Sequence, residues 1–179
     1  MKLLTRAPKQ TLQDRLIWQS ASLLLAYPDD RCAERLDTVE RLLNQVTGGA
    51  GELLALTAAT LRASDPLRAA ADYVETFDLR RRTTMYLTYW TAGDTRNRGS
   101  EMLAFAAAYR AAGVDPPRDE APDYLPVALE FAATDPDSQW LAALTWVKSV
   151  FAKQQRLSQR PLAECPADRK STRLNSSHT

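Results

Sequence analysis

The amino-acid sequence predicts a single all-α domain, and three observations support this prediction. Apolar residues recur at i, i+3, i+4 and i+7 spacing in most segments, which marks the buried face of an amphipathic helix. Helix start and stop signals separate these segments, and no alternating apolar stretch bounded by turn residues indicates a strand. The 179 residues suit one domain with a sizeable core, and neither a repeat nor a low-complexity linker divides them. We therefore expect a helical bundle with short connections.

Local signals bound the first two predicted helices. Thr11 and Asp14 have the spacing of a capping box, so a helix starts here. Pro28 ends this helix, because proline lacks the N–H that continuation requires. The second helix opens at the aspartates 29–30 and stops at the glycine pair 48–49.

The third predicted helix runs from Glu52 to about Ala63. The apolar positions that it presents are Leu53, Leu54, Leu56 and Leu61. The fourth helix has a strong start signal, because Asp65 follows Ser64 as a cap and Pro66 takes the first helical position. Its expected buried positions are Ala70, Tyr73, Val74 and Phe77.

A cluster of large side chains precedes Gly93 and is expected to end in a short helix. The cluster comprises Met85, Tyr86, Tyr89 and Trp90. Beyond it, Asp94 has the position of an N-cap for a further helix. The buried face of that helix is predicted to contain Met102, Phe105, Ala106 and Tyr109, followed by Ala112 or Gly113. Gly99, in the first turn, costs about 1 kcal/mol relative to Ala, which suggests that another backbone packs closely there.

Two more helices follow towards the end of the chain. Asp123, bracketed by Pro122 and Pro126, is expected to cap the first of them, and Pro126 is tolerated near a helix start. The second follows residues 135–137. Its apolar positions are Trp140, Leu141, Leu144, Val147 and Phe151.

Three separated motifs resemble the NarJ family of nitrate reductase assembly chaperones, which belongs with the TorD-like maturation chaperones of molybdenum enzymes. They are residues 73–78 (YVETFD), 93–99 (GDTRNRG) and 122–126 (PDYLP), in this order and at these separations. The resemblance covers about residues 11–160 and implies the all-α TorD-like fold. The chain departs from the family pattern at Tyr124, where many relatives have His, so a role that needs an imidazole does not carry over.

The domain boundaries follow from these signals. We expect an N-terminal arm at residues 1–10, the helical chaperone domain at 11–160 and a truncated remainder at 161–167. Residues 168–179 read like one translation frame of a common sequencing adaptor, and we treat them as an artefact that contains His178, the one histidine. The native C-terminal helix would then be missing.

Composition excludes several classes of protein. The 23 basic and 22 acidic residues give no overall attraction to nucleic acid or to an anionic membrane. No apolar run is long enough to span a bilayer, and the first ten residues lack an export signal, so a cytoplasmic protein is expected. Cys32 and Cys165 form no metal-ligand pattern. We expect no bound metal or cofactor.

The residues needed for common catalytic sites are absent, so we expect no enzyme. Glu75 and Asp78 share one helix face with Arg82, and this group is either a solvated ion-pair stripe or an acidic lip for a basic peptide. The arginines 80–82 point in different directions on a helix and cannot form a nucleic-acid groove alone.

Two further features have a structural and a functional interpretation. The rings of Tyr86, Tyr89 and Trp90 either pack in the core or line an apolar groove for a partner helix. Arg98 lies at the rim of the interior and needs an acceptor, for which Glu75, Asp78 and Asp123 are the candidates. A paired arginine can still shape a groove.

The resemblance implies a chaperone that binds the apo catalytic α subunit of nitrate reductase through its N-terminal segment. It would hold that segment until iron–sulfur clusters and the molybdenum cofactor are inserted and before membrane docking, with molybdenum-cofactor delivery proteins as further candidate partners. The candidate client-binding residues are Tyr73, Glu75, Asp78, Tyr89, Arg98, Glu101, Asp123 and Tyr124. Two alternatives stay open: a chaperone of a different molybdenum oxidoreductase, and a helical enzyme that uses a carboxylate pair.

Overall fold

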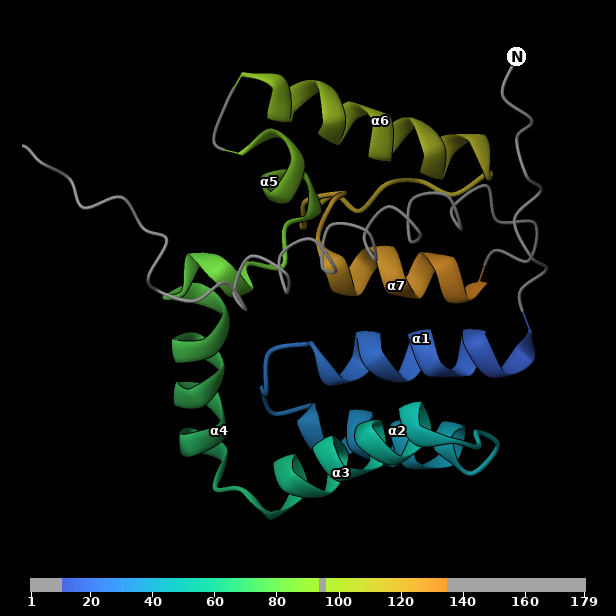
Figure 1. The fold of residues 1–179 in the computed structure, drawn as a ribbon, viewed down its shortest axis with the longest axis vertical. Helices are drawn as coiled ribbons and strands as arrows, with labels where there is room; N and C mark the ends of the chain where they lie inside the picture. Colours follow the sequence, from blue (N-terminus) through green and yellow to red (C-terminus); the bar gives the residue numbers. More distant parts are fainter. Residues whose placement is uncertain (1–10, 94–95, 135–179) are drawn as a thin grey trace, which may run out of the picture.

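The computed structural model describes residues 11–93 and 96–134, and this part of the chain is built from helices (Figure 1). In chain order the α-helices are α1 (Leu12–Leu24), α2 (Cys32–Leu43), α3 (Gly49–Ala63), α4 (Pro66–Tyr73), α5 (Leu87–Ala92), α6 (Asn97–Ala111) and α7 (Leu125–Thr134). A π-helix (Val74–Asp78) and a short 3₁₀ helix (Arg81–Thr83) lie between α4 and α5. The all-α prediction is confirmed.

Helix α1 is the central element of the described fold. It lies between α7 on one side and the α2–α3 pair on the other (Figure 1). Its Leu23 and Leu24 pack against the α2–α3 core, whereas Trp18 and Leu25 pack against α7, so the helix is apolar on two opposite faces. Ser22, which is buried, donates a hydrogen bond of 2.7 Å from Oγ to the carbonyl oxygen of Pro126.

The second layer of packing is formed by α5 and α6 on α7. Leu87 of α5 and Ala128 of α7 share one apolar cluster, against which Phe105 of α6 also packs. Tyr109 of α6 meets Phe131 of α7 in an edge-on contact with ring centroids 4.6 Å apart. The predicted face of α6 is confirmed, since Ala106 and Tyr109 are buried.

The starts of α1 and α4 have the caps that the sequence predicts. Thr11 and Asp14 form the predicted capping box: the N–H of Asp14 donates to Thr11 Oγ1, and the N–H of Thr11 donates to Asp14 Oδ2, at 3.1 Å each. Asp65 Oδ1 accepts the N–H groups of Leu67 and Arg68 at 3.1 Å each, and Pro66 takes the first helical position. These caps satisfy backbone donors that a helix start leaves free.

The predicted fourth helix does not stay regular to its end. After Tyr73 the backbone widens into the π-helix Val74–Asp78, and the chain then turns through Arg81–Thr83. Arg82 therefore does not continue a helix face that carries Asp78. Glu75 pairs instead with Arg80 at the surface. The predicted stripe of Glu75, Asp78 and Arg82 is wrong in this respect.

The interpretation of Gly99 is also wrong. An added Cβ at this residue would meet no atom within 4 Å, and the residue is exposed. No other backbone among the described residues packs against it.

Some predictions lie outside the described residues. These are the N-terminal arm at 1–10, the N-cap at Asp94, the helix after residues 135–137, and the segments 161–167 and 168–179. Within the described part, no helix is long and apolar enough to cross a membrane.

Candidate functional site

The motif at residues 122–126 is joined by backbone hydrogen bonds to the segment before α5. The residues before α5 and those before α7 form an isolated antiparallel bridge between Tyr86 and Tyr124. The N–H of Leu87 donates to the carbonyl oxygen of Asp123 at 3.0 Å, and the N–H of Leu125 donates to that of Met85 at 2.8 Å. The starts of α5 and α7 are therefore fixed against each other, although the two segments lie far apart in sequence.

Asp123 is fully buried and caps a helix other than the predicted one. Its Oδ2 accepts the backbone N–H of Thr88 at 3.1 Å and the hydroxyl of Thr88 at 2.5 Å. Thr88 is the second residue of α5, so Asp123 satisfies free donors at the start of α5 rather than of α7. Asp123 Oδ1 has no hydrogen-bond partner among the described residues. The prediction that Asp123 caps its own helix is wrong.

Arg98 is linked to the buried Asp123 through Thr88. Its Nε donates to Thr88 Oγ1 at 3.2 Å, and its guanidinium lies 5.5 Å from the centroid of the Tyr86 ring, at cation–π distance. Among the described residues, the acceptor is thus a hydroxyl and not one of the three expected carboxylates. Thr88, which links Arg98 to Asp123, was not among the predicted site residues, because nothing in its sequence neighbours distinguishes it from other helical threonines.

The motif at residues 73–78 joins this network through a hydrogen bond between two tyrosines. The hydroxyls of Tyr73 and Tyr124 lie 3.0 Å apart, and Tyr73 also donates to the carbonyl oxygen of Leu25 at 3.1 Å. The Tyr124 ring lies 5.5 Å from that of Tyr86, between centroids. The structure therefore brings all three motif regions to one place.

Burial raises the pKa of the Tyr73 hydroxyl, and its hydrogen bond to Tyr124 adds to this effect. Burial also raises the pKa of Tyr124 and of Tyr86. The carboxylates of Asp78 and Glu120 contribute, since both act on Tyr124. All three phenols are therefore neutral near pH 7.

The remaining predicted residues lie around this network. Asp78 is exposed and forms no ion pair within the described residues, while Glu75 is exposed and paired with Arg80. Glu101 accepts the hydroxyl of Thr91, which ties α6 to α5. Tyr89 contacts Trp90 edge-on, with centroids 6.4 Å apart. These side chains are surface or half-buried positions at the edge of the network.

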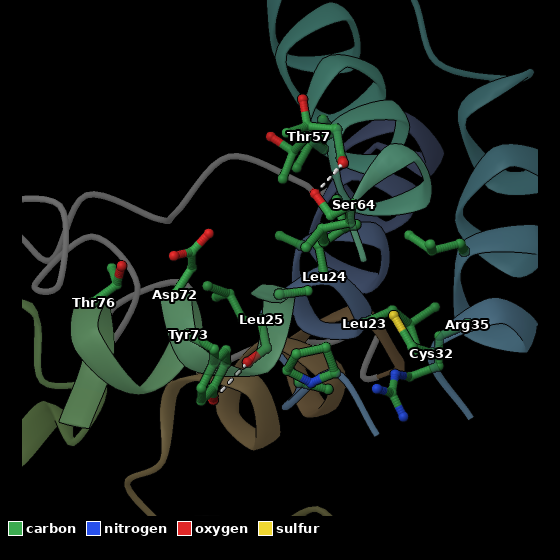
Figure 2. A pocket seen from close by; sticks show the side chains of 18 of the residues that line it. Leu23, Leu24, Leu25, Cys32, Arg35, Thr57, Ser64, Asp72, Tyr73 and Thr76 are labelled. Carbon is green, nitrogen blue, oxygen red and sulfur yellow. Dashed lines mark hydrogen bonds between the residues drawn. The ribbon is translucent and has the colours of Figure 1, made fainter. Parts of the chain in front are cut away.

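An apolar cavity lies elsewhere, between the end of α1 and helices α2, α3 and α4. It has a volume of about 630 Å³, and Tyr73 is the one predicted site residue that lines it. Figure 2 shows Leu23 and Leu24 of α1, Cys32 of α2, Thr57 of α3 and Tyr73 of α4 around it. Its walls are leucines that the sequence marks as ordinary core positions, so no local signal indicated it.

The described residues provide no metal site, since no group of three His, Cys, Asp or Glu side chains could hold an ion. Glu75, with its arginine partner at the surface, is not arranged with Asp78 as an enclosed acid–base pair. What the arrangement offers is a tyrosine cluster with carboxylates at its edge, next to an apolar cavity.

Comparison with known proteins identifies related chains. A family model described as the nitrate reductase delta subunit matches residues 40–165. The nitrate reductase-like protein NarX of Mycobacterium tuberculosis is 60% identical over 124 residues, which are 69% of this chain and 19% of that protein. A Bacillus subtilis protein named as the nitrate reductase molybdenum cofactor assembly chaperone NarJ is 33% identical over 80% of this chain and 74% of its own length.

The Escherichia coli NarJ chaperone is 37% identical over 56% of this chain and 43% of its own length. A crystal structure of a protein from Archaeoglobus fulgidus, described as a redox enzyme maturation protein, has a TM-score of 0.53 at 21% identity, covering 88% of this chain and 100% of its own. This likeness confirms the TorD-like fold. The NarJ names agree with a family of assembly chaperones rather than of catalysts. The chain therefore belongs to the nitrate reductase delta subunit family, as its three motifs predicted.

Proposed function

We propose that this protein is a cytoplasmic assembly chaperone for respiratory nitrate reductase. It binds the N-terminal segment of the apo catalytic α subunit and holds it while the molybdenum cofactor and iron–sulfur clusters are inserted. Release then allows the finished subunit to dock on its membrane anchor. The relatives named as molybdenum cofactor assembly chaperones support this function.

One observation supports the proposal: residues of the three motif regions meet around a cluster formed by Tyr73, Tyr86 and Tyr124. Tyr73, Tyr86 and Tyr124 are half-buried, so part of each ring remains accessible to a partner. Tyrosine combines a large apolar surface with a polar tip, and such residues are enriched at the centres of binding sites.

The charges at this surface favour a basic segment. Asp78 and Glu120 both raise the pKa of Tyr124, so two carboxylates act on this side of the tyrosine cluster. Because Asp78 forms no ion pair among the described residues, it remains available for a lysine or arginine of the client. Asp123 and Arg98 serve this surface from inside, since they hold the start of α5 and the Tyr86 ring in place.

Calorimetry of the full chain against a synthetic peptide of the N-terminal segment of the α subunit tests the proposal. We expect a Kd of about 1 μM or below, equivalent to about 8 kcal/mol or more. Asp78→Asn removes the free charge and should weaken binding about threefold to tenfold at low salt, with a smaller effect at high salt. Tyr89→Ala should also weaken binding, because the proposed client surface includes the Tyr89 ring.

Asp37→Asn is the matched control for Asp78→Asn, because Asp37 is likewise exposed but lies on α2, where it pairs with Arg62. Its affinity should equal that of the unaltered chain. Absence of binding to the nitrate reductase peptide would refute the proposal. Tighter binding of the corresponding peptide from a different molybdenum oxidoreductase would assign the chaperone to that client instead.

A further inference from the structure

We propose that Arg98 binds a carboxylate of the client and that Thr88 is the residue that positions it. This inference rests on the proposed function and names the chemistry that is recognised at one point of the surface, an aspartate or glutamate side chain of the client segment. The contacts of the Arg98 side chain carry it. Its Nε donates to Thr88, whereas its terminal nitrogens, Nη1 and Nη2, have no hydrogen-bond partner within residues 11–93 and 96–134.

Thr88 holds the inner edge of the Arg98 guanidinium. Thr88 is fully buried, and its hydroxyl donates to Asp123 Oδ2 at 2.5 Å while accepting from Arg98 Nε at 3.2 Å. A hydroxyl has a single hydrogen to donate, and the buried carboxylate takes it here, so Thr88 faces Arg98 only as an acceptor. The guanidinium is therefore held by an acceptor that cannot turn away.

Two restraints reduce the freedom of the Arg98 side chain before any ligand binds. Its Nε is held by Thr88, and its guanidinium carbon lies over the Tyr86 ring, 5.5 Å from the centroid. A flexible side chain loses rotamer entropy when a ligand immobilises it. Because Arg98 is half-buried and already oriented, that loss is smaller. The structure thus presents a preorganised guanidinium.

Other arginines are explained without a ligand. Arg15 is also half-buried, but its Nε donates at 2.6 Å to the carbonyl oxygen of Ala133 near the end of α7, where a cation is favourable. Exposed arginines without an ion pair in the described part of the chain, such as Arg81, Arg82 and Arg110, are held there by no buried group. They keep their rotamer freedom, so they are weaker candidates for a specific contact.

The free end of Arg98 suits a carboxylate. No carboxylate of the described residues pairs directly with Arg98, since Glu75 pairs with Arg80 and Asp123 bonds Thr88. The terminal nitrogens of a guanidinium form a planar fork that donates two parallel hydrogen bonds to a carboxylate. A lysine at this place would carry the same charge but could not present that fork.

The neighbouring charges limit where a client carboxylate can lie. Besides burial, the Glu120 carboxylate raises the pKa of both Tyr86 and Tyr124, and Asp78 raises that of Tyr124. These two side chains would repel an acidic residue placed elsewhere on the tyrosine pair and would attract a basic one. A client segment with one acidic residue beside its basic residues would therefore be fixed in register by Arg98.

Calorimetry of the full chain against two peptides tests this inference. The first is the α-subunit N-terminal segment with an amidated C-terminus, and the second has each Asp and Glu replaced by Asn and Gln. We expect the unaltered chain to bind the second peptide about tenfold more weakly. Arg98→Lys should bind the first peptide about tenfold more weakly than the unaltered chain does, and its two affinities should differ less than about twofold.

Substitutions of Thr88 separate positioning from stability. Thr88→Val keeps the shape but removes the acceptor for Nε, so the affinity ratio of the two peptides should fall to about threefold. Thr88→Ser keeps the hydroxyl and should restore a ratio of about tenfold. Arg110→Lys is the matched control, because Arg110 is exposed on the same helix, and it should leave the ratio unchanged.

Three results would overturn the inference and leave the proposed function intact. They are equal affinities of the unaltered chain for the two peptides, an undiminished ratio in Arg98→Lys, and tight binding of a client segment that has no acidic side chain. A ratio that Thr88→Val leaves unchanged, with both affinities lowered equally, would overturn the positioning role of Thr88. Absence of peptide binding to the unaltered chain would refute the proposed function and this inference with it.

Discussion

Replacement of Asp123 by alanine should destabilise the protein strongly, and the structure gives the magnitude. Asp123 Oδ2 accepts two hydrogen bonds from Thr88, at 3.1 Å and 2.5 Å, inside the protein. Hydrogen bonds to a charged group contribute about 1.5 to 3 kcal/mol each. Part of this gain is offset, because the unpartnered Oδ1 is also buried and loses its hydration. We expect Asp123→Ala to lower the free energy of unfolding by about 2 to 4 kcal/mol.

Urea denaturation followed by circular dichroism measures this change. Asp123→Asn keeps one oxygen that can accept the Thr88 N–H and should cost about half as much as alanine. Thr88→Val removes the hydroxyl that links Asp123 to Arg98, so the Asp123→Asn and Thr88→Val double variant should show a coupling energy of about 1 kcal/mol. Asp72→Ala is the control, because its partner Arg68 is an exposed surface residue, and it should cost less than about 1 kcal/mol.

A free energy of unfolding of Asp123→Ala within about 0.5 kcal/mol of that of the unaltered protein would refute this expectation, because ordinary surface substitutions have effects of that size. Additive effects of the Asp123 and Thr88 changes would also contradict it, because they would show that the two side chains do not act together.

Two further predictions concern pH and α6. The pKa values of Tyr73, Tyr109 and Tyr124 are raised from the ordinary value near 10, chiefly by burial, so the folded state favours the neutral phenols. The stability that these neutral phenols contribute is fully present below pH 10 and is lost as the pH rises above 10. Between neutral and alkaline pH, the free energy of unfolding of Tyr124→Phe should therefore fall less than that of the unaltered protein. An equal fall would contradict this assignment. Gly99→Ala should raise the free energy of unfolding by about 0.5 to 1 kcal/mol in urea, because the exposed helical position has free space for a Cβ. Destabilisation by Gly99→Ala would show that this part of α6 needs glycine for a reason other than packing.

The helix caps at Thr11 and Asp65 could be predicted because each depends on residues two or three positions away. Helical periodicity likewise identified the buried face of α6 and the all-α class. The periodic pattern did not distinguish Leu53 and Leu56, which are exposed, from leucines that fill the core. Periodicity identifies one apolar stripe, but it does not show how much of the stripe a neighbouring element covers.

The candidate site was harder to predict because its contacts are non-local. The fold links Tyr73, Arg98, Asp123 and Tyr124 through hydrogen bonds, and their role in client binding stays a prediction. Their partners could not be derived, since Asp123 bonds Thr88 across 35 positions of sequence. The same limit applies to the cavity, whose walls come from four helices.

The cap that α5 receives from Asp123 has a consequence for the order of events during synthesis. Helix α5 has six residues, far fewer than the roughly 12 to 15 that an isolated helix needs to persist in water. The acceptor for its first turn lies 35 residues further along and leaves the ribosome later. A nascent chain that ends before Pro122 therefore lacks the carboxylate that holds this turn. We expect hydrogen exchange at the Thr88 amide to stay fast until the segment around Asp123 has joined it, so the tyrosine surface is completed only at a late stage of translation.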